Sequence, residues 1–321
     1  MWGCGKLQMK TIIAILLTLL CAALAWLNYI PLEHLDGLDL PTVQTGYKEM
    51  TKHRIVICGI TRDNAVELPV VIKHIEHTGQ HFADYRVIVF ENDSRDGTKQ
   101  VLAKWQAGNP KVHIISKDFG NVKRPSLEFM AAARNQYMTK LFNDPQYQDF
   151  DMVMVVDMDH IHGWDDRGVA DSFAKIDRWD SVGSNGIYDD KGTMYDLLAF
   201  RSPDFPHRIT RKELGYKTVS TECLKKYGKA FCERVYPVGS NLVPVQSCFG
   251  GMAFYKKQYI KGCKYASIDN DCEHLPFHAC LREQNQGRMV MNPSQVLRYF
   301  HYLPLLVRDF PIVIKVLLRD S

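Results

Sequence analysis

The sequence predicts an α/β fold in which a doubly wound, mainly parallel β-sheet is flanked by helices. Three observations predict it: strand-like apolar runs alternate with helix-like segments, polar clusters follow the runs, and the composition is that of a globular protein. With 321 residues, 46% of them hydrophobic, the chain can form one large domain or two small ones. The net charge is only +4 and the sequence contains no block of basic residues, so we expect no nucleic-acid partner.

An apolar segment near the N-terminus is expected to cross a membrane. Residues 11–27 carry no charge, and residues 28–30 extend them to about 20 residues, the length that spans a bilayer. Lys6 and Lys10 precede the segment, which places the N-terminus in the cytosol. We therefore expect a tail (1–10), an uncleaved signal anchor (11–30) and a single-pass type II topology, with the rest in the lumen of the Golgi or another secretory compartment. A cleaved signal peptide is the alternative.

The elements beyond the anchor follow in order from the spacing of apolar residues. Residues 31–52 have no clear period and are expected to form a stem before a domain at 53–321. Strands are predicted at residues 54–60, 85–90, 112–116 and 153–159, and helices at 67–77, 98–105 and 127–142. A helix at 168–179 and strands at 181–187, 193–200, 246–255 and 288–291 are predicted after them. Residues 201–245 are irregular, and the apolar stretch 303–318 packs on the domain or lies on a membrane surface.

Two aspartates end the fourth predicted strand. Asp157 and Asp159 are two residues apart, so on a strand their carboxylates point to the same side. Like charges that close are costly unless a cation lies between them, and oxygen ligands suit Mg²⁺ or Mn²⁺. Polar clusters at 62–64, 91–96 and 118–124 follow the other strands, at the sheet edge where ligands bind. The alternative is two ordinary surface aspartates at a strand exit.

Four motifs carry a resemblance to a known class. ICGITRDN (57–64), FENDSRDGT (90–98), AAARNQY (131–137) and VVDMD (155–159) resemble the GT-A class of nucleotide-sugar-dependent glycosyltransferases in order and spacing. The match covers roughly residues 53–160. Two shorter motifs, YDLLAFR (195–201) and SCFGGMA (247–253), more weakly resemble a fungal capsule-type mannosyltransferase branch. No G-x-G-x-x-G turn follows the first strand, which disfavours a dehydrogenase.

The resemblance implies roles for residues in the first half of the domain. Asp157 and Asp159 match the D-x-D motif that holds a divalent metal and the donor diphosphate. The remaining matches are donor-binding residues: Asp93 at the nucleoside, Thr61 and Arg62 near base and ribose, and Arg134 on the helix before the D-x-D strand. An Asx turn is the alternative for Asp93, and an exposed helix position is the alternative for Arg134.

An acidic segment at residues 269–278 is the expected source of the catalytic base. The class often places there an acid that deprotonates the acceptor hydroxyl; Glu273 is the first choice and Asp271 the second. His274 or His278 is expected to be a further metal ligand, and His160 and His162 rank lower for that role. The alternative is a helix N-terminus decorated with acids. The paired glycines in 246–255 are expected to line the sugar pocket or to form a bulge in the core.

The cysteines indicate disulfides in the second half of the domain. Seven of the nine cysteines lie beyond the anchor, so at least one is unpaired, and Cys58, in a core strand, is expected to be that one. Cys223–Cys232 and Cys263–Cys272 are the expected pairs, although connectivity does not follow from sequence. A zinc site is less favoured because the chain has no C-x₂-C pair.

The sequence thus predicts a membrane-anchored, GT-A-like glycosyltransferase with a donor half at about 53–165 and an acceptor half at about 166–300. It would transfer a sugar, mannose being one candidate, from a GDP- or UDP-sugar to a glycan or glycoprotein, with Mn²⁺ or Mg²⁺ as cofactor. A catalytically silent sugar-binding module on the same scaffold and a nucleotidyltransferase are the two alternatives. With Glu273 as base, the simplest mechanism is single displacement with inversion, and a retaining mechanism stays open.

Overall fold

The computed structural model describes residues 37–120, 126–160, 163–188, 193–205 and 236–299, together with residues 225, 226, 228 and 234. All of them belong to one compact unit, Leu35–Ser321. The predicted tail and anchor, the stretch 303–318 and most of 201–245 lie outside the described residues. Within the described ranges, no helix is both long and apolar enough to cross a membrane. The anchor and the type II topology therefore stay predictions.

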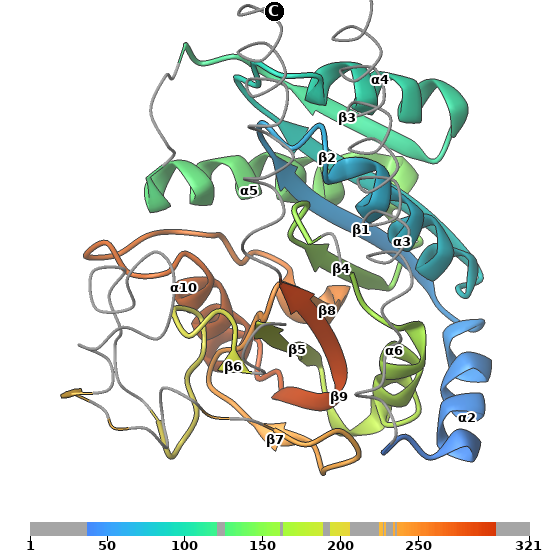
Figure 1. Ribbon diagram of the computed structural model, residues 1–321, viewed down its shortest axis with the longest axis vertical. Helices are drawn as coiled ribbons and strands as arrows, with labels where there is room; N and C mark the ends of the chain where they lie inside the picture. The colour runs from blue at the N-terminus through green and yellow to red at the C-terminus, as the bar shows by residue number, and fades with distance from the viewer. Residues whose placement is uncertain are drawn as a thin grey trace, which may run out of the picture. The chain divides into compact units, whose positions relative to one another are not determined.

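One mixed β-sheet organises the described residues (Figure 1). Its strands lie in the order β3-β2-β1-β4-β8-β5-β9-β7, and β6 pairs with β5. The strands are β1 (Arg54–Thr61), β2 (Asp84–Glu91), β3 (Val112–Ser116), β4 (Met152–Val156), β5 (Ser181–Tyr188), β6 (Thr193–Met194), β7 (Val243–Pro244), β8 (Met252–Lys256) and β9 (Met289–Tyr299).

The first half of the sheet is parallel, as predicted. β1 pairs in parallel with β2 and with β4, and β2 pairs in parallel with β3. The predicted strands 54–60, 85–90 and 112–116 are confirmed to within one residue at either end. The fourth predicted strand, 153–159, ends at Val156 as β4, so Asp157 and Asp159 lie beyond the strand. Every residue of β4 is buried, which is typical of parallel strands covered on both faces. The carboxyl ends of these strands therefore meet at one edge, as the polar clusters indicated.

The second half of the sheet is not mainly parallel, which corrects the prediction. β8 is antiparallel to both β4 and β5, β7 is antiparallel to β9, and β5 and β9 are parallel. The physical reason is that β8 enters the sheet between two strands that precede it in the chain. That pairing is non-local, and apolar runs do not specify it.

Several predicted boundaries change in the same half. The predicted helix 168–179 ends at Phe173, and a 3₁₀ turn at Ile176–Arg178 follows it. The predicted strand 193–200 is reduced to β6, because the chain turns at Asp196, where φ is 63°. The predicted strand 246–255 begins only at Met252, because Gly250 and Gly251 have φ of 61° and 84°. The predicted strand 288–291 is the start of the longer β9.

Helices cover both faces of the sheet (Figure 1). They are α2 (Leu40–Met50), α3 (Leu68–Gln80), α4 (Thr98–Gly108), α5 (Leu127–Asn143), α6 (Asp166–Phe173) and α10 (His274–Ala279). Alternate residues of β1 enter different cores: Ile55 and Ile57 pack with residues of α3 and α6, whereas Val56 and Cys58 pack with residues of α5 and α10. The α3 and α5 predictions are confirmed, with α3 three residues longer at its C-terminal end.

Helix α2 occupies residues that were expected to form an irregular stem. Asp39 caps it by accepting a hydrogen bond from Thr42 N at 3.0 Å. Val43 and Met50 are buried, and a Cβ on Gly46 would lie 1.7 Å from Ala170 O of α6, so the two helices are in close contact there. The buried positions recur at helical spacing, a period that the prolines and glycines around them obscured.

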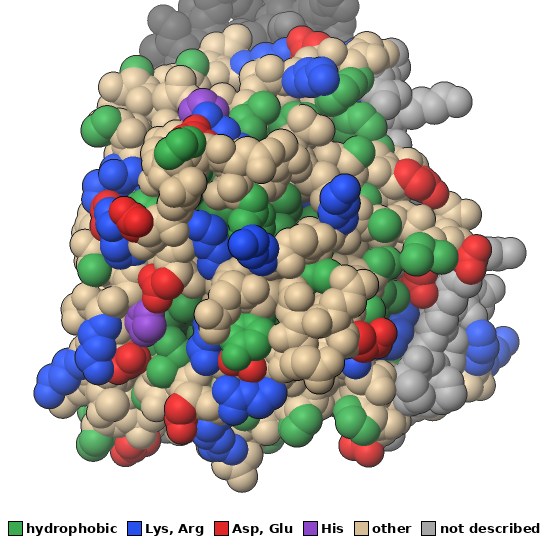
Figure 2. All heavy atoms as spheres, turned by 180° about the vertical axis from the view of Figure 1, so that it is seen from behind, with side chains coloured by type: hydrophobic (Ala, Val, Ile, Leu, Met, Phe, Trp, Pro, Cys, Tyr) green, Lys and Arg blue, Asp and Glu red, His purple; other side chains and the backbone are tan. Residues whose placement is uncertain are grey.

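Charged side chains of both signs share the surface. Figure 2 shows Lys and Arg interspersed with Asp and Glu over the described part of the back face. The positive net charge is therefore not gathered into a single patch on that part of the face.

Candidate functional site

The D-x-D residues follow β4 at the carboxyl edge of the parallel strands. Asp157 N donates a hydrogen bond to Gly251 O at 2.9 Å, which fixes the backbone at the strand exit. Met158 is buried between the two acids, against Gly59 of β1. The side chains of Asp157 and Asp159 are 20% and 43% exposed, so both carboxylates are accessible at this edge. Both aspartates lie beyond the end of β4, and not on the strand as the i, i+2 spacing predicted.

His160 completes a group of three potential metal ligands with these aspartates. Its Nε2 lies 3.7 Å from Asp157 Oδ2 and 3.9 Å from Asp159 Oδ1. One ligand atom from each residue lies within 4.8 Å of the others. The His160 ring is fully buried, and neither of its nitrogens has a hydrogen-bond partner in the described part of the chain. A buried imidazole without a hydrogen-bond partner, beside two carboxylates, fits a bound divalent cation.

The position of His160 is set by its neighbours. The rings of Tyr195 and Tyr299 contact it edge-on, both at 5.2 Å between centroids. A Cβ on Gly251 would lie 2.6 Å from His160 Nε2, and one on Gly250 would lie 2.1 Å from Ser184 O. The paired glycines therefore allow close approach to the His160 ring and to β5. Their predicted place in a sugar pocket stays a prediction.

His274 and His278 do not belong to this group, and the expectation that one of them is a further metal ligand stays a prediction. His278 is buried between Ser247 Oγ, 2.7 Å from Nδ1, and Tyr255 OH, 2.9 Å from Nε2, and burial lowers its pKa to about 3. His274 stacks on Phe249 with 4.1 Å between ring centroids. Neither belongs to a group of three potential ligands among the described residues. The reason is that α10 packs both rings into the core. His162 lies outside the described residues.

Arg134 links the D-x-D motif to the acidic segment. It is 1% exposed, which excludes the alternative of an exposed helix position. Its Nε donates to Glu273 Oε1 at 3.0 Å, and its Nη2 donates to Asp157 Oδ1 at 3.3 Å. Its Nη1 is buried without a hydrogen-bond partner in the described ranges. Burial alone would raise the pKa of Asp157, but His160 and Arg134 outweigh burial and hold it below the ordinary value.

The two candidate bases occupy different surroundings. Glu273 is 2% exposed; Oε1 is bound by Arg134, and Oε2 has only a 3.8 Å contact from Cys272 Sγ among the hydrogen bonds of the described chain. Asp271 Oδ1 accepts Cys272 N at 2.8 Å and lies 3.4 Å from Arg201 Nη2. The structure thus brings Glu273, through Arg134, into the same cluster as Asp157. Asp271 is held by Arg201 instead.

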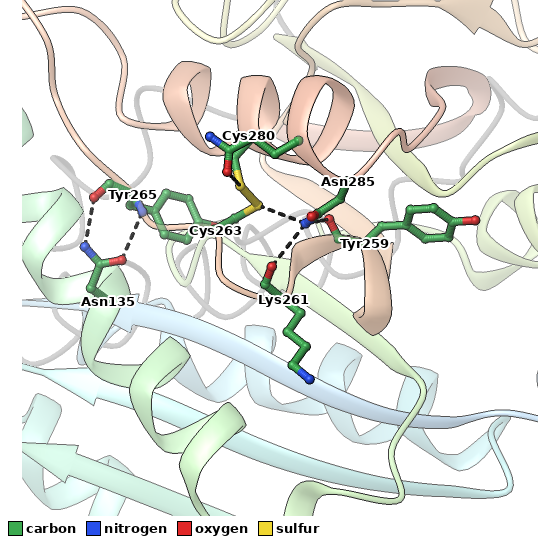
Figure 3. The surroundings of a disulfide bond; sticks show 8 residues. Asn135, Tyr259, Lys261, Cys263, Tyr265, Cys280 and Asn285 are labelled. Carbon is green, nitrogen blue, oxygen red and sulfur yellow. Dashed lines mark hydrogen bonds between the residues drawn. A yellow bond between two sulfur atoms is a disulfide. The ribbon is translucent and has the colours of Figure 1, made fainter.

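A disulfide and an amide clamp position the segment that carries Glu273 (Figure 3). Cys263 and Cys280 form a disulfide, so the expected Cys263–Cys272 pair is wrong. Asn135 of α5 donates to Tyr265 O at 2.8 Å and accepts from Tyr265 N at 2.9 Å. Asn135 directly follows Arg134, so neighbouring residues of α5 hold Tyr265 and the carboxylate of Glu273.

Three of the remaining cysteines of the domain are unpaired in the structure, and two lie outside the described residues. Cys58 is unpaired and buried, as expected, and Cys248 and Cys272 are unpaired as well. Cys272 packs in the core beside Glu273, where helix α10 directs Cys280, and not Cys272, toward Cys263. Cys223 and Cys232 lie outside the described residues.

Asp196 joins this cluster although sequence reasoning missed it. Burial, together with the charges of Asp157 and Glu273, raises its pKa to about 8. Its Oδ2 accepts a hydrogen bond from Gly250 N at 3.2 Å. Its φ of 63° is unusual for a residue other than glycine and marks a constrained position. The YDLLAFR motif contains it, but the expected strand there gave no reason to single it out.

The residues expected near the nucleoside lie at the same sheet edge, and their side chains make contacts with neighbouring loop residues. Asp93 Oδ1 accepts Phe119 N at 2.9 Å, and its own N donates to Asp118 Oδ1 at 2.9 Å, so Asp93 joins the loops after β2 and β3. Thr61 is 4% exposed and its hydroxyl bonds the Asn64 side-chain amide at 3.0 Å. Arg62 pairs with Asp63 at 3.5 Å. These contacts place the three residues, and their contact with a nucleotide stays a prediction.

Comparisons with known proteins give structural matches only. No family model matches the chain, and no curated protein matches it in sequence. Among solved structures, TarS 1-349 of S. aureus is 13% identical over 82% of this chain and 64% of that chain, with a TM-score of 0.44. Mannosyltransferase PcManGT from Pyrobaculum calidifontis, in complex with GDP-Man and Mn²⁺, is 13% identical over 81% and 65%, also at 0.44.

A third similar structure is GalNAc-T7 with UDP, GalNAc and Mn²⁺, 11% identical over 78% of this chain and 44% of that chain, with a TM-score of 0.43. This chain spans less than two thirds of the length of each of the three matched chains. All three TM-scores lie below 0.5, so the function proposed below rests on the geometry of the site.

Proposed function

We propose that the protein is a metal-dependent glycosyltransferase that transfers a sugar from a nucleotide-sugar donor to a glycan or glycoprotein acceptor. One observation carries the proposal. At the carboxyl edge of the parallel strands, Asp157, Asp159 and His160 form a metal-ligand group, and Arg134 connects that group to the buried carboxylate of Glu273. Transfer of a sugar from a nucleoside diphosphate needs a metal site, a positively charged side chain such as Arg134 and a separate carboxylate, all at one sheet edge.

The donor set favours Mn²⁺ over Mg²⁺. Mg²⁺ binds oxygen ligands in a strict octahedron, whereas an imidazole such as that of His160 suits transition metals better. The unpartnered nitrogens of His160 and the two accessible carboxylates fit such a cation. When bound, the metal would stabilise the negative charge that develops on the leaving nucleoside diphosphate.

Residues of the chain itself would bind and orient the substrates. Arg134 holds Asp157 and Glu273 in place, and its buried Nη1 has the capacity to bind one further acceptor atom, such as a donor phosphate oxygen. Glu273 Oε2 is the oxygen that would accept the proton of the acceptor hydroxyl, in a single displacement with inversion. Asp196, half-buried and next to the same charges, is the second candidate for this proton.

The proposal extends to the identity of the donor and to the N-terminal apolar segment. The donor would be a GDP- or UDP-sugar, mannose being one candidate sugar, bound by the loops that carry Thr61, Arg62 and Asp93. The apolar segment 11–30 would anchor the protein as a single-pass type II membrane protein with a lumenal catalytic domain. Its charge-free length supports that topology.

The proposal is tested with the detergent-solubilised full chain. Nucleotide sugars are screened by thermal shift with Mn²⁺, and the stabilising donors are then assayed for nucleoside diphosphate release with glycan acceptors. We expect release that requires Mn²⁺, that is lost in Asp159→Asn and that is retained in Asp149→Asn, a change at an 86% exposed aspartate. Pyrophosphate release from a nucleoside triphosphate would favour a nucleotidyltransferase, and binding without turnover would favour a silent sugar-binding module.

The base is tested separately. Glu273→Gln should abolish transfer and leave nucleotide binding intact, because the amide cannot accept the proton but keeps the shape of the side chain. If Glu273→Gln transfers sugar at the wild-type rate and Asp196→Asn does not, Asp196 is the base.

A further inference from the structure

A second group of potential metal ligands lies away from the D-x-D motif. His77 in the last turn of α3 and His81 at its C-cap are four residues apart, so they share one face of the helix. Asp166, the first residue of α6, faces them. One ligand atom from each of the three residues lies within 4.8 Å of the others. The group comes from elements that the proposed transfer reaction does not use.

Asp166 is held in position as metal-binding carboxylates are. It is 8% exposed, and its Oδ1 accepts a hydrogen bond from Thr78 Oγ1 at 2.5 Å. Thr78 Oγ1 in turn accepts Trp164 Nε1 at 2.8 Å. The other oxygen, Oδ2, contacts His77 Nδ1 directly and lies 3.5 Å from His81 Nε2. Supporting hydrogen bonds of this kind orient metal ligands and are part of a metal site.

One nitrogen of the group makes no hydrogen bond to a described residue. His81 Nε2 is a buried atom and has no hydrogen-bond partner in the described part of the chain. The Tyr47 ring of α2 packs on the His81 ring, with 4.7 Å between centroids, and so restricts its rotation. A buried polar atom without a partner requires an explanation. A cation bound to Asp166 Oδ2 would also bind His81 Nε2, which lies 3.5 Å from that oxygen.

We propose that His77, His81 and Asp166 bind a second divalent cation, Zn²⁺, with water as the fourth ligand. Two imidazoles and one carboxylate form a ligand set that suits zinc. Bonds of about 2.0–2.1 Å in a tetrahedron place ligand atoms about 3.3 Å apart. The 3.5 Å between His81 Nε2 and Asp166 Oδ2 agrees with that spacing. His77 must move outward as the cation enters, and its 68% exposed side chain is free to do so.

The bound cation would join α3 to α6. Helix α6 begins seven residues after Asp159 in the chain, so the second cation would secure the element that follows the D-x-D segment. The site does not depend on the proposed glycosyl transfer. It predicts a zinc content that is separate from the Mn²⁺ requirement of the reaction.

The test is a zinc titration of the chelator-treated full chain, followed by isothermal titration calorimetry and by metal analysis after gel filtration. The D-x-D group also binds zinc in principle, so the titration uses an Asp157→Asn/Asp159→Asn background. In that background we expect one zinc per chain, and Co²⁺ in its place should show the visible absorption bands of a tetrahedral site. His77→Ala/His81→Ala should remove both signals.

The matched control is His53→Ala. His53 also contacts two carboxylates, Glu49 at 3.4 Å and Asp151 at 2.5 Å, but it belongs to no group of three potential ligands among the described residues. This variant should bind zinc as its parent does. Asp166→Asn, which keeps the shape of the side chain, serves as the second variant if the histidine pair reduces folding; it should weaken zinc binding at least tenfold. Zinc binding by the histidine variant with unchanged stoichiometry and affinity, or no zinc binding by the parent at micromolar concentrations, would overturn the proposal.

Discussion

Replacing Arg134 with methionine should destabilise the protein severely. Arg134 is 1% exposed and bridges Glu273 and Asp157, at 3.0 Å and 3.3 Å. Methionine keeps much of the side-chain volume and removes the charge. Glu273, 3% exposed at its side chain, is then left as a buried carboxylate without its ion-pair partner. Asp157, 20% exposed, keeps some contact with water and contributes less to the loss.

The magnitude follows from burial and charge. A pair of charges about 4 Å apart gains about 4 kcal/mol at an effective dielectric constant of about 20. Removing one partner of a buried pair costs about 3–5 kcal/mol, because the other charge stays desolvated. We therefore expect Arg134→Met to lower the free energy of unfolding by about 3–5 kcal/mol. Arg134→Met with Glu273→Leu should recover a large part of that loss, since it removes the buried charge as well.

The assay is urea unfolding of the full chain in detergent, followed by tryptophan fluorescence. The control is Lys52→Met, which removes the ion pair of a 65% exposed lysine with Glu49 and should cost less than about 1 kcal/mol. Equal unfolding free energies for Arg134→Met and Lys52→Met would refute the reasoning. So would a double variant that is less stable than Arg134→Met alone.

Three further predictions test other parts of the structure. The double variant Cys263→Ser/Cys280→Ser should lower the free energy of unfolding by about 3 kcal/mol, because the disulfide joins residues 17 positions apart in the chain. If the wild type and the double variant still differ in unfolding free energy under reducing conditions, the disulfide is not the cause. Gly251→Ala should lower the free energy of unfolding by about 1–3 kcal/mol and weaken Mn²⁺ binding, because the added Cβ would meet His160. The control is Gly262→Ala, which has a similar φ but open space around its Cβ, so it should show backbone strain only and bind Mn²⁺ normally. Equal Mn²⁺ affinities in the two variants would be evidence against the contact between residue 251 and His160. The hydrogen bond to Asp151 raises the pKa of His53, so His53 stabilises the fold below its unfolded pKa of about 6.5, and this stabilisation is lost as pH rises through the raised folded pKa. The difference in unfolding free energy between the wild type and His53→Gln should therefore be larger at pH 6 than at pH 9. A difference that does not change with pH would rule this role of His53 out.

The parallel half of the fold could be predicted because its signals are local. The apolar runs of β1 and β4 and the helical faces of α3 and α5 are each visible within a short window of sequence. The place of Asp157 and Asp159 at the sheet edge follows from the apolar run directly before them, although both residues lie beyond the end of β4. His160 was within reach of the same reasoning, since it directly follows Asp159. A histidine beside a strand exit is often solvated and its sequence context does not single it out, whereas here two tyrosine rings bury it.

The rest depended on contacts between distant residues. The antiparallel entry of β8 and the choice of Cys280 as the partner of Cys263 are set by packing, which sequence spacing does not report. Asp196 enters the cluster because the backbone turns at a positive φ, in a stretch whose apolar residues are also consistent with a strand. His274 and His278 resemble metal ligands in sequence and are core residues in the structure.

The most direct test of the central claim is Mn²⁺ binding by wild-type protein and by His160→Gln, followed through the electron paramagnetic resonance signal of free Mn²⁺. If Asp157, Asp159 and His160 bind the metal as one group, His160→Gln should weaken binding at least about tenfold, the loss typical of a change in or next to a metal shell. The titration is made with the donor diphosphate absent, so that the chain's own ligands decide the affinity. Unchanged Mn²⁺ affinity in His160→Gln, with the protein folded, would contradict the assignment of this site.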